Sequence, residues 1–304
     1  MQLDQLSNTQ IGDYILQEQI GRRAAIVLYR ATQQSLKRFA VVKIIDLKSV
    51  PIPTEALEED FVTFTRSVVA LEHMHLQPIY DYSIVDNQYI FIAARFMAGN
   101  LHELLRTGAM PLEQASELAA QIIEAVAFVH ANGLIHSSLS PRNVYLDEVS
   151  NAYIDDLELS RVVQAARTTK ELQTLIDDPF YISVEQLQLK PLDFRSEIYS
   201  VGAILYHMVT GKAPFANQDN SFNAVLARKL HNQITPPRQI NPLISVDLDS
   251  AILRTLRANP AERFPDLSDL QRALTKEFGA LGSRNRSLIA LLRQVMDRLW
   301  RNND

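Results

Sequence analysis

The chain has 304 residues, of which 47% are hydrophobic and 21% are charged, a balance typical of folded globular proteins and not of disordered ones. It contains no cysteine, which excludes disulfides and thiolate zinc sites and is typical of a reducing compartment. The net charge of −5 gives no electrostatic attraction to a phosphate backbone, so we expect no nucleic-acid partner. The sequence has no signal-like start and no run of about 18 apolar residues, and we therefore expect a cytoplasmic protein without a transmembrane segment.

The first third of the chain is rich in short β-type runs. Val, Ile, Tyr and Phe are concentrated in four segments, at residues 14–20, 25–32, 39–46 and 89–96, and this composition favours strands. One helix is expected between the third and the fourth run, with a Thr N-cap and apolar residues at helical spacing. Its residues are Thr54, Leu57, Phe61, Phe64 and Val68.

After Gly99 the pattern changes to long amphipathic helices. Two examples are residues 112–133 and 196–211, each of which ends at a glycine suited to a helix C-terminus. Strands first and helices second predict an α+β protein, with a small β-rich lobe, a larger helical lobe and a ligand cleft between them. The expected divisions are an N-terminal extension at 1–10, the small lobe and hinge at 11–99, the large lobe at 100–280, and an amphipathic helix at 281–304.

The predicted C-terminal helix has one apolar face, made by Leu288, Leu292, Val295 and Leu299. Arginines and an aspartate fall largely on the opposite face. This pattern is compatible with packing on the helix's own domain, with docking to a partner protein, and with peripheral contact with an anionic membrane surface. The sequence leaves these alternatives open.

Two polar segments carry the most specific signal. They read HSSLSPRNVYLD from His136 and AYIDDLELSR from Ala152, and they resemble the catalytic loop and the metal-binding loop of protein kinases. The kinase pattern HRDxxxxN falls on His136, Ser137, Ser138 and Asn143, and the DFG pattern falls on Asp156, Leu157 and Glu158.

Three further positions extend the resemblance from about residue 11 to residue 278. Lys43 stands at the position of the strand lysine, Glu185 lies near the position of the APE glutamate, and Arg263 occupies the arginine position of NPAERF. The whole pattern is most similar to bacterial serine/threonine kinases of the eukaryotic type. The resemblance implies the two-lobed kinase fold, a structural role for His136, and a buried ion pair between Glu185 and Arg263.

The catalytic positions depart from the family pattern. Ser138 replaces the aspartate that acts as general base, and this change alone should lower the rate roughly 10²- to 10⁴-fold. Ser140 replaces the loop lysine that contacts the γ-phosphate, which removes a positive charge from the transition state. Phe64 falls at the position of the helix glutamate, so Lys43 is expected to lack its usual orienting partner unless Glu58 or Glu59 substitutes.

The nucleotide site is partly retained. The resemblance assigns nucleotide binding to Gly21, Lys43, Asn143 and Asp156, and metal binding to Asn143 and Asp156. The other two glycines of the phosphate loop are replaced by Arg23 and Ile26, although Arg22 and Arg23 could bring guanidinium groups to phosphate oxygens. We therefore expect ATP and Mg²⁺ binding to be weak or absent. Asp155 adjoins Asp156, but the spacing from Asn143 favours Asp156 as the metal ligand.

Two main functional hypotheses follow from the resemblance, beside a third possibility, a nucleotide sensor that transfers no phosphate. The first is a pseudokinase that acts as a regulatory or protein-interaction module in bacterial signalling, with an active kinase or another signalling protein as its partner. The second is a slow or atypical ATP-dependent serine/threonine kinase, in which Asp155, Glu158 or another acid replaces the missing base.

Overall fold

The structure, a computed structural model, describes residues 3–23, 26–46, 64–85, 89–97, 99–164, 166, 168–176 and 178–279. The chain divides into two compact units, one rich in strands and one mostly helical, which makes it an α+β protein. The first unit contains Met1–Met97, His136–Ser138 and Asp156–Asp178, and the second contains Ala98–Ile135, Leu139–Asp155 and Pro179–Asp304.

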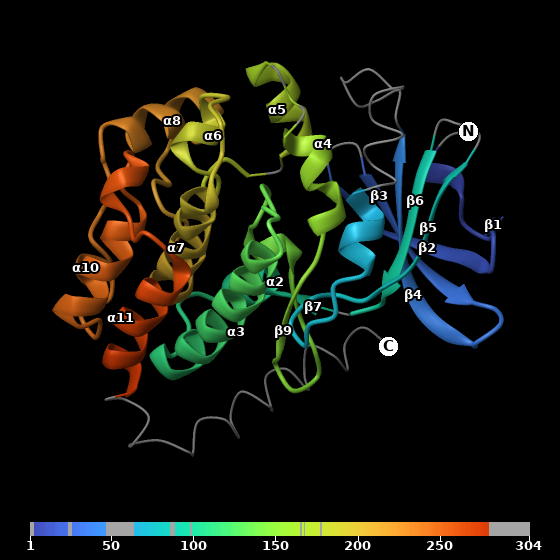
Figure 1. Cartoon of the computed structure of the whole chain (residues 1–304), viewed down its shortest axis with the longest axis horizontal. Helices are drawn as coiled ribbons and strands as arrows, with labels where there is room; N and C mark the ends of the chain where they lie inside the picture. The colour runs from blue at the N-terminus through green and yellow to red at the C-terminus, as the bar shows by residue number, and fades with distance from the viewer. Residues whose placement is uncertain are drawn as a thin grey trace. The chain divides into compact units, whose positions relative to one another are not determined.

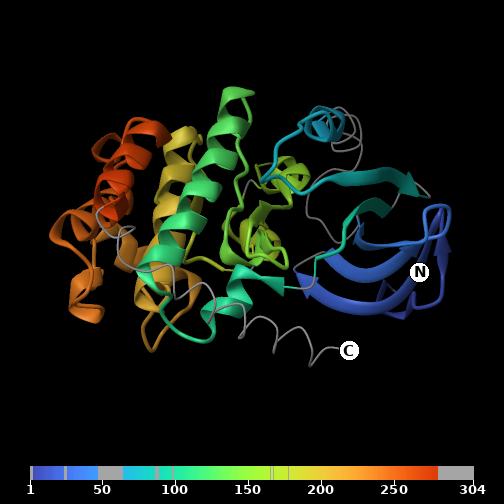
Figure 2. The same cartoon turned by 90° about the horizontal axis from the view of Figure 1, so that it is seen from below.

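The first unit is built on an antiparallel six-stranded sheet with the order β1-β2-β3-β4-β6-β5. The ribbon shows that this sheet is strongly curled (Figures 1 and 2). All four predicted strand segments are confirmed as β2, β3, β4 and β6. The strands are β1 (Gln10–Ile11), β2 (Tyr14–Arg23), β3 (Ile26–Gln33), β4 (Arg38–Asp46), β5 (Ile79–Val85) and β6 (Tyr89–Arg95).

Both faces of β4 are buried, and this decides where Lys43 lies. Val42 and Ile44 belong to an apolar cluster on one face, while Val41 and Ile45 belong to clusters on the other. Side chains alternate along a strand, so Lys43 shares the face of Val41 and Ile45. The lysine is therefore placed inside the unit and not at its surface.

The N-terminal residues that the sequence assigned to an extension pack on the other face of the sheet. Leu6 is buried in the same cluster as Val42 and Ile44. Tyr29 fixes the segment, because its hydroxyl donates to the Leu3 carbonyl at 2.7 Å and lies 3.2 Å from the Leu6 amide nitrogen.

Five short helical segments complete the described part of the first unit. They are the 3₁₀ turn η1 (Leu3–Gln5), residues 64–69, the 3₁₀ turn η4 (Leu157–Leu159), α4 (Ser160–Gln164) and α5 (Thr169–Leu175). Residues 64–69 are the end of the helix that the sequence predicts from Thr54, and its earlier residues lie outside the described part of the chain. Helix α5 begins at a capping box in which Thr168 and Glu171 each bond the other's backbone.

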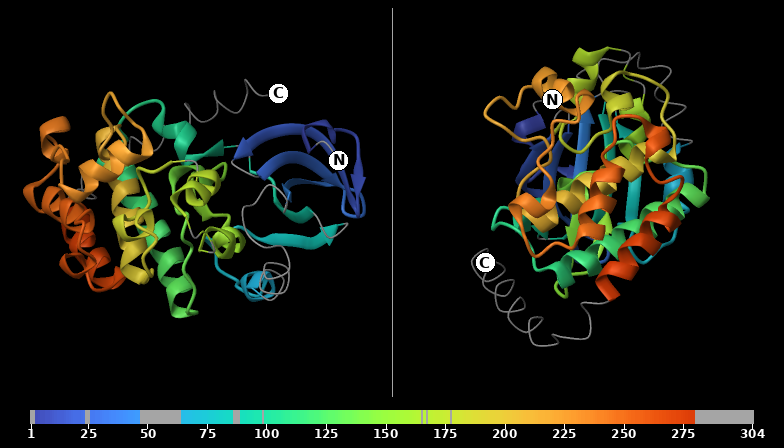
Figure 3. Two further views of the ribbon diagram at one scale, coloured as in Figure 1. Left: turned by 90° about the horizontal axis from the view of Figure 1, so that it is seen from above. Right: turned by 90° about the vertical axis from the view of Figure 1, so that its left-hand side faces the viewer.

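The second unit packs its helices around α3 and α7 (Figure 3). Both are predicted by the sequence and confirmed, and α7 ends at Gly211 with φ of 69°, a conformation that glycine adopts without strain. Its helices and 3₁₀ turns are α2 (Leu101–Leu105), α3 (Leu112–Ala131), η3 (Pro141–Asn143), α6 (Val184–Leu187), α7 (Phe194–Thr210), α8 (Phe222–Leu230), α9 (Pro237–Ile240), α10 (Val246–Thr255), η5 (Pro260–Glu262) and α11 (Leu267–Gly279).

A small antiparallel sheet lies in the same unit. Its strands are β7 (Gly99–Asn100), β8 (Val144–Leu146) and β9 (Ala152–Ile154). The predicted C-terminal helix at 281–304 lies outside the described residues. Among the described helices, none combines the length and the apolar character needed to cross a bilayer.

Candidate functional site

Lys43 is the centre of a buried polar cluster in the first unit. Its Nζ lies 2.7 Å from Asp156 Oδ1 and 2.7 Å from Glu158 Oε1. The lysine side chain has no exposed surface, and the two carboxylate side chains are only 8% and 2% exposed. A buried charge of this kind is stable only when it is paired and hydrogen-bonded, so the two acids are what allow Lys43 to be buried.

The backbone after β9 brings both acids to the same ammonium group. Asp156 has φ of 66°, a left-handed conformation that aspartate tolerates better than most residues. The chain then turns directly into η4 and α4. This turn places Glu158 two residues after Asp156 and beside Lys43.

Apolar contacts hold the turn against the sheet. Leu159 and Val162 form one buried cluster with three isoleucines of β4 and β6, which are Ile45, Ile90 and Ile92. At the far end of α4, Gln164 Nε2 donates to the Ser137 hydroxyl at 2.6 Å. Residues 157–164 are therefore fixed at both ends and in the middle, and we call them the latch segment.

Lys43 has two carboxylate partners in the described part of the chain, Asp156 and Glu158, and neither stands at the position of the family's helix glutamate. Phe64, at the position of the family's helix glutamate, is buried and only 6% exposed. Glu58 and Glu59, the substitutes considered from sequence, lie outside the described residues. In the described part of the chain, the carboxylates that contact Lys43 belong to Asp156 and Glu158, in the segment after β9.

Serines occupy the catalytic loop where the family has charged residues. Ser138 Oγ lies 3.3 Å from Nδ1 of His136, which is itself buried. This hydroxyl carries no charge and is a weak base at neutral pH. The arrangement therefore presents a neutral group at the position where the family places the general base.

Ser140 and Asn143 lie in the second unit and stabilise their own backbone. The Asn143 side-chain oxygen accepts the Ser140 amide at 2.8 Å, and the Ser140 hydroxyl accepts the Arg142 amide at 3.3 Å. The two residues thus form a capping box on η3. Asp155, the alternative metal ligand, is in the same unit and donates its amide to the Asn143 carbonyl at 2.9 Å.

At the phosphate-loop position, the side chains of Arg22 and Ile26 are already engaged in contacts within the protein. Arg22 forms an exposed ion pair with Asp4 at 2.6 Å, and Ile26 packs against a buried cluster that includes Leu28 and Val41. Gly21 lies in β2, where an added Cβ would come within 3.2 Å of the Leu28 side chain. The side chain of Arg23 lies outside what the structure describes.

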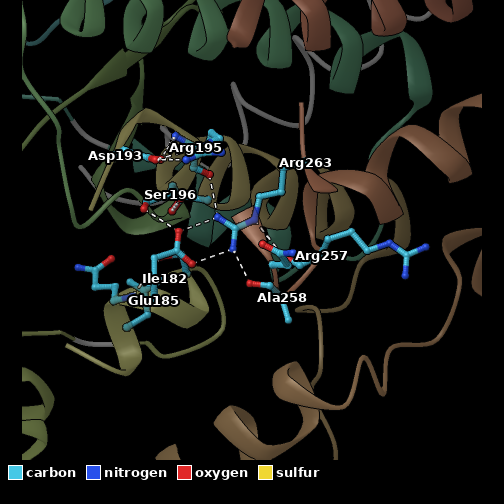
Figure 4. A network of polar contacts seen from close by, with 12 residues as sticks. Ile182, Glu185, Asp193, Arg195, Ser196, Arg257, Ala258 and Arg263 are labelled. Carbon is cyan, nitrogen blue, oxygen red and sulfur yellow. Dashed lines mark hydrogen bonds and ion pairs between the residues drawn. The ribbon is translucent and has the colours of Figure 1, made fainter. Parts of the chain in front are cut away.

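Glu185 and Arg263 form a bidentate ion pair in the core of the second unit (Figure 4). Burial alone would raise the pKa of the Glu185 carboxyl, but hydrogen bonds from Arg263 and Ser196 outweigh it and leave that pKa below its ordinary value. The pair therefore contributes stability above about pH 4.5 that is lost as the pH falls through the lowered pKa. Arg263 also donates to three backbone carbonyls, those of Arg195, Arg257 and Ala258.

The residues fit Mg²⁺ in their chemistry but do not fit a nucleotide phosphate as they stand. Asp156 and Glu158 offer carboxylate oxygens, the ligand type that Mg²⁺ prefers. Lys43, the cation that would face a phosphate, already donates to both carboxylates and has no exposed surface. A phosphate could therefore contact Lys43 only after a rearrangement that exposes its ammonium group.

Sequence reasoning placed Glu158 near the metal position but missed its role as the partner of Lys43. The available signal was an acid two residues after Asp156 in a chain whose helix glutamate is missing. The separation of 115 residues between Lys43 and Glu158 means that only the fold can bring them together.

Comparison with known proteins agrees with these motifs and with the fold. The model of the protein kinase domain matches residues 14–278. The chain is 28% identical to the serine/threonine-protein kinase PknB of Mycobacterium leprae over 216 residues, which are 69% of this chain and 34% of that protein. It is 28% identical to a probable serine/threonine-protein kinase of Clostridium acetobutylicum over 259 residues, which are 84% of this chain and 38% of that protein.

A third relative is the serine/threonine-protein kinase PknE of Mycobacterium tuberculosis, which is 26% identical over 269 residues, or 87% of this chain and 46% of PknE. The chain thus spans less than half of the length of these relatives. The match to the domain model covers most of the chain, from β2 to α11. The chain belongs to the protein kinase family.

Proposed function

We propose that this chain is a pseudokinase domain, which keeps the kinase fold, transfers no phosphate at a useful rate, and acts as a regulatory or protein-interaction module in signalling. The observation that supports this most is the neutral Ser138 at the general-base position, 3.3 Å from the His136 ring. A serine hydroxyl cannot hold the substrate proton at neutral pH as a carboxylate does.

The rate losses expected from Ser138 and Ser140 favour a chain without useful kinase activity. Protein kinases turn over at about 1–100 per second, and the loss of a general base lowers a rate by about 10²- to 10⁴-fold. Ser140 removes a further positive charge, and each 1.36 kcal/mol of lost transition-state stabilisation is about another tenfold. Together these changes leave about 10⁻⁵ to 10⁻¹ turnovers per second, at least a thousandfold below the rate of the same kinase with an intact site.

ATP and Mg²⁺ are proposed as weak ligands at most. Asp156 would supply a carboxylate oxygen to the metal, and Lys43 would supply the cation for a phosphate. Lys43 donates a hydrogen bond to Asp156 and another to Glu158. We infer that the free energy of breaking these contacts is subtracted from nucleotide affinity.

The partner that we propose is a protein, either an active kinase or another signalling protein. The buried pair of Glu185 and Arg263 supports this proposal, because it preserves a stable helical unit after the catalytic groups are gone. Contact of residues 281–304 with such a partner or with a membrane surface stays a prediction.

The second candidate is a slow serine/threonine kinase, and the names of the relatives favour it. In this case an acid other than the usual aspartate must act as the base. Glu158 is engaged with Lys43, which argues against it in this arrangement, and Asp155 is the other acid considered.

Transfer of labelled γ-phosphate from ATP with Mg²⁺ separates the two candidates. The purified chain is assayed on itself and on a generic protein substrate, beside Lys43→Ala as the background. For a pseudokinase the two signals are equal, and Ser138→Asp alone or with Ser140→Lys is the variant that would gain activity. Transfer by the unmodified chain above the Lys43→Ala background contradicts the proposal and supports the slow kinase.

A further inference from the structure

Glu158 contacts Lys43, the residue that the family pattern assigns to phosphate binding. Its carboxylate lies 2.7 Å from Lys43 Nζ, and the pair is almost completely buried. We propose that Glu158 is a built-in competitor for the phosphates of a nucleoside di- or triphosphate, so that nucleotide binding and the packing of the latch segment exclude each other. The inference deepens the proposed function and rests on its assignment of the nucleotide site to Lys43.

Electrostatic repulsion makes Glu158 and a phosphate direct competitors for Lys43. Two carboxyl groups, those of Asp156 and Glu158, already share the single ammonium of Lys43. An incoming phosphate adds further negative charge beside these two acids in a buried cluster, where Coulomb repulsion is weakly screened. Since Lys43 also has no exposed surface, burial and repulsion together favour the release of Glu158 when a phosphate contacts the ammonium.

The release of Glu158 from Lys43 is coupled to the packing of the whole latch segment. Leu159 follows Glu158 immediately and is buried with Val162 against the isoleucines of the sheet. The segment ends at Gln164, whose amide bonds Ser137. Because Glu158 lies inside a turn continuous with α4, its carboxylate cannot swing far from Lys43 while these contacts persist.

Thermodynamic linkage between nucleotide binding and the release of the latch segment has a regulatory consequence. If the nucleotide favours the state with a released latch segment, then a partner that binds the released segment raises nucleotide affinity, and the nucleotide raises the affinity for that partner by the same factor. A protein partner that binds residues 157–164 would thus open the nucleotide site. In the family pattern the partner of the lysine lies on the helix of the small lobe, whereas here it lies on the latch segment itself.

The test is the affinity for ADP, measured by titration calorimetry with and without Mg²⁺. Glu158→Gln keeps the size of the side chain but removes the charge, and it should bind ADP about tenfold more tightly or better, within the usual range of coupling between sites. Glu117→Gln removes the same charge from an exposed position on α3 and should leave the affinity unchanged.

Glu158→Asp provides a second variant in case the glutamine variant folds poorly. Its carboxylate is one methylene further from Lys43, so it should bind ADP more tightly than the unmodified chain and less tightly than Glu158→Gln. ADP affinity that is unchanged or lower in both Glu158 variants overturns the proposal. Phosphate transfer by the unmodified chain overturns the proposed function but leaves this result intact, so the two failures are distinguishable.

Discussion

At the scale of single residues, Lys43 shows how a lost partner is replaced. The helix position that should carry a glutamate holds Phe64, a buried aromatic side chain, and an unpaired buried ammonium would be strongly destabilising. Glu158 and Asp156 supply the missing charge from a segment more than a hundred residues away. The sequence showed that the helix position lacks its glutamate, but it did not identify Glu158 as a partner of Lys43.

His207 gives the residue-scale prediction for pH. Burial, with a smaller contribution from His102, lowers the pKa of His207 to about 4, and its Nδ1 lies 2.6 Å from the Tyr181 hydroxyl. Between this value and the ordinary 6.5 the unfolded chain binds a proton that the folded chain does not, so stability is lost as the pH falls through this window.

The loss attributable to His207 is of the order of 3 kcal/mol when the pH falls from 6.5 to 4. Urea unfolding at a series of pH values should show this slope in the unmodified chain and a flatter one in His207→Gln. An equal slope in both proteins would mean that another group titrates in this range.

At the scale of elements, the long periodic segments are predictable and the short irregular ones are not. The spacing of apolar residues from Leu112 and from Phe194 indicates helices, because a buried stripe is needed over several turns. The latch segment has only eight residues, and its helical form depends on contacts with Ile45, Ile90 and Ile92. Such tertiary contacts leave no periodic trace in the sequence.

The contact between α7 and α10 gives a prediction at this scale. A Cβ added to Gly202 would lie 2.4 Å from Thr255 Cβ, closer than packed carbon atoms can be. Gly202→Ala should therefore force the two helices apart and lower the free energy of unfolding by about 1–3 kcal/mol.

Asn223→Ala, at an exposed position on α8, is the control and should change stability by less than about 0.5 kcal/mol. Denaturant midpoints measure both variants. If Gly202→Ala is as stable as the control, then the approach of α7 to α10 is not the reason for a glycine at this position.

At the scale of the whole molecule, the sequence predicts the two units and most of the family landmarks. Glu185 and Arg263 could be aligned as a pair because each stands in a recognisable motif, NPAERF among them. The division at the loops could not be predicted, since His136–Ser138 and Asp156–Asp178 join the strand-rich unit although they follow α3 and β9 of the other unit. These two segments carry Ser138 and Glu158, so the least predictable part of the fold is also the part that bears on function.

Hydrogen–deuterium exchange of residues 157–164, without any nucleotide, measures most directly whether Glu158 anchors the latch segment to Lys43. The backbone amides of this segment should exchange about tenfold faster or more in Glu158→Gln than in the unmodified chain, because each 1.4 kcal/mol removed from the closed state raises local opening tenfold. Glu117→Gln should show the unmodified rate. Equal exchange in all three proteins would contradict the claim that Glu158 anchors the latch segment to Lys43.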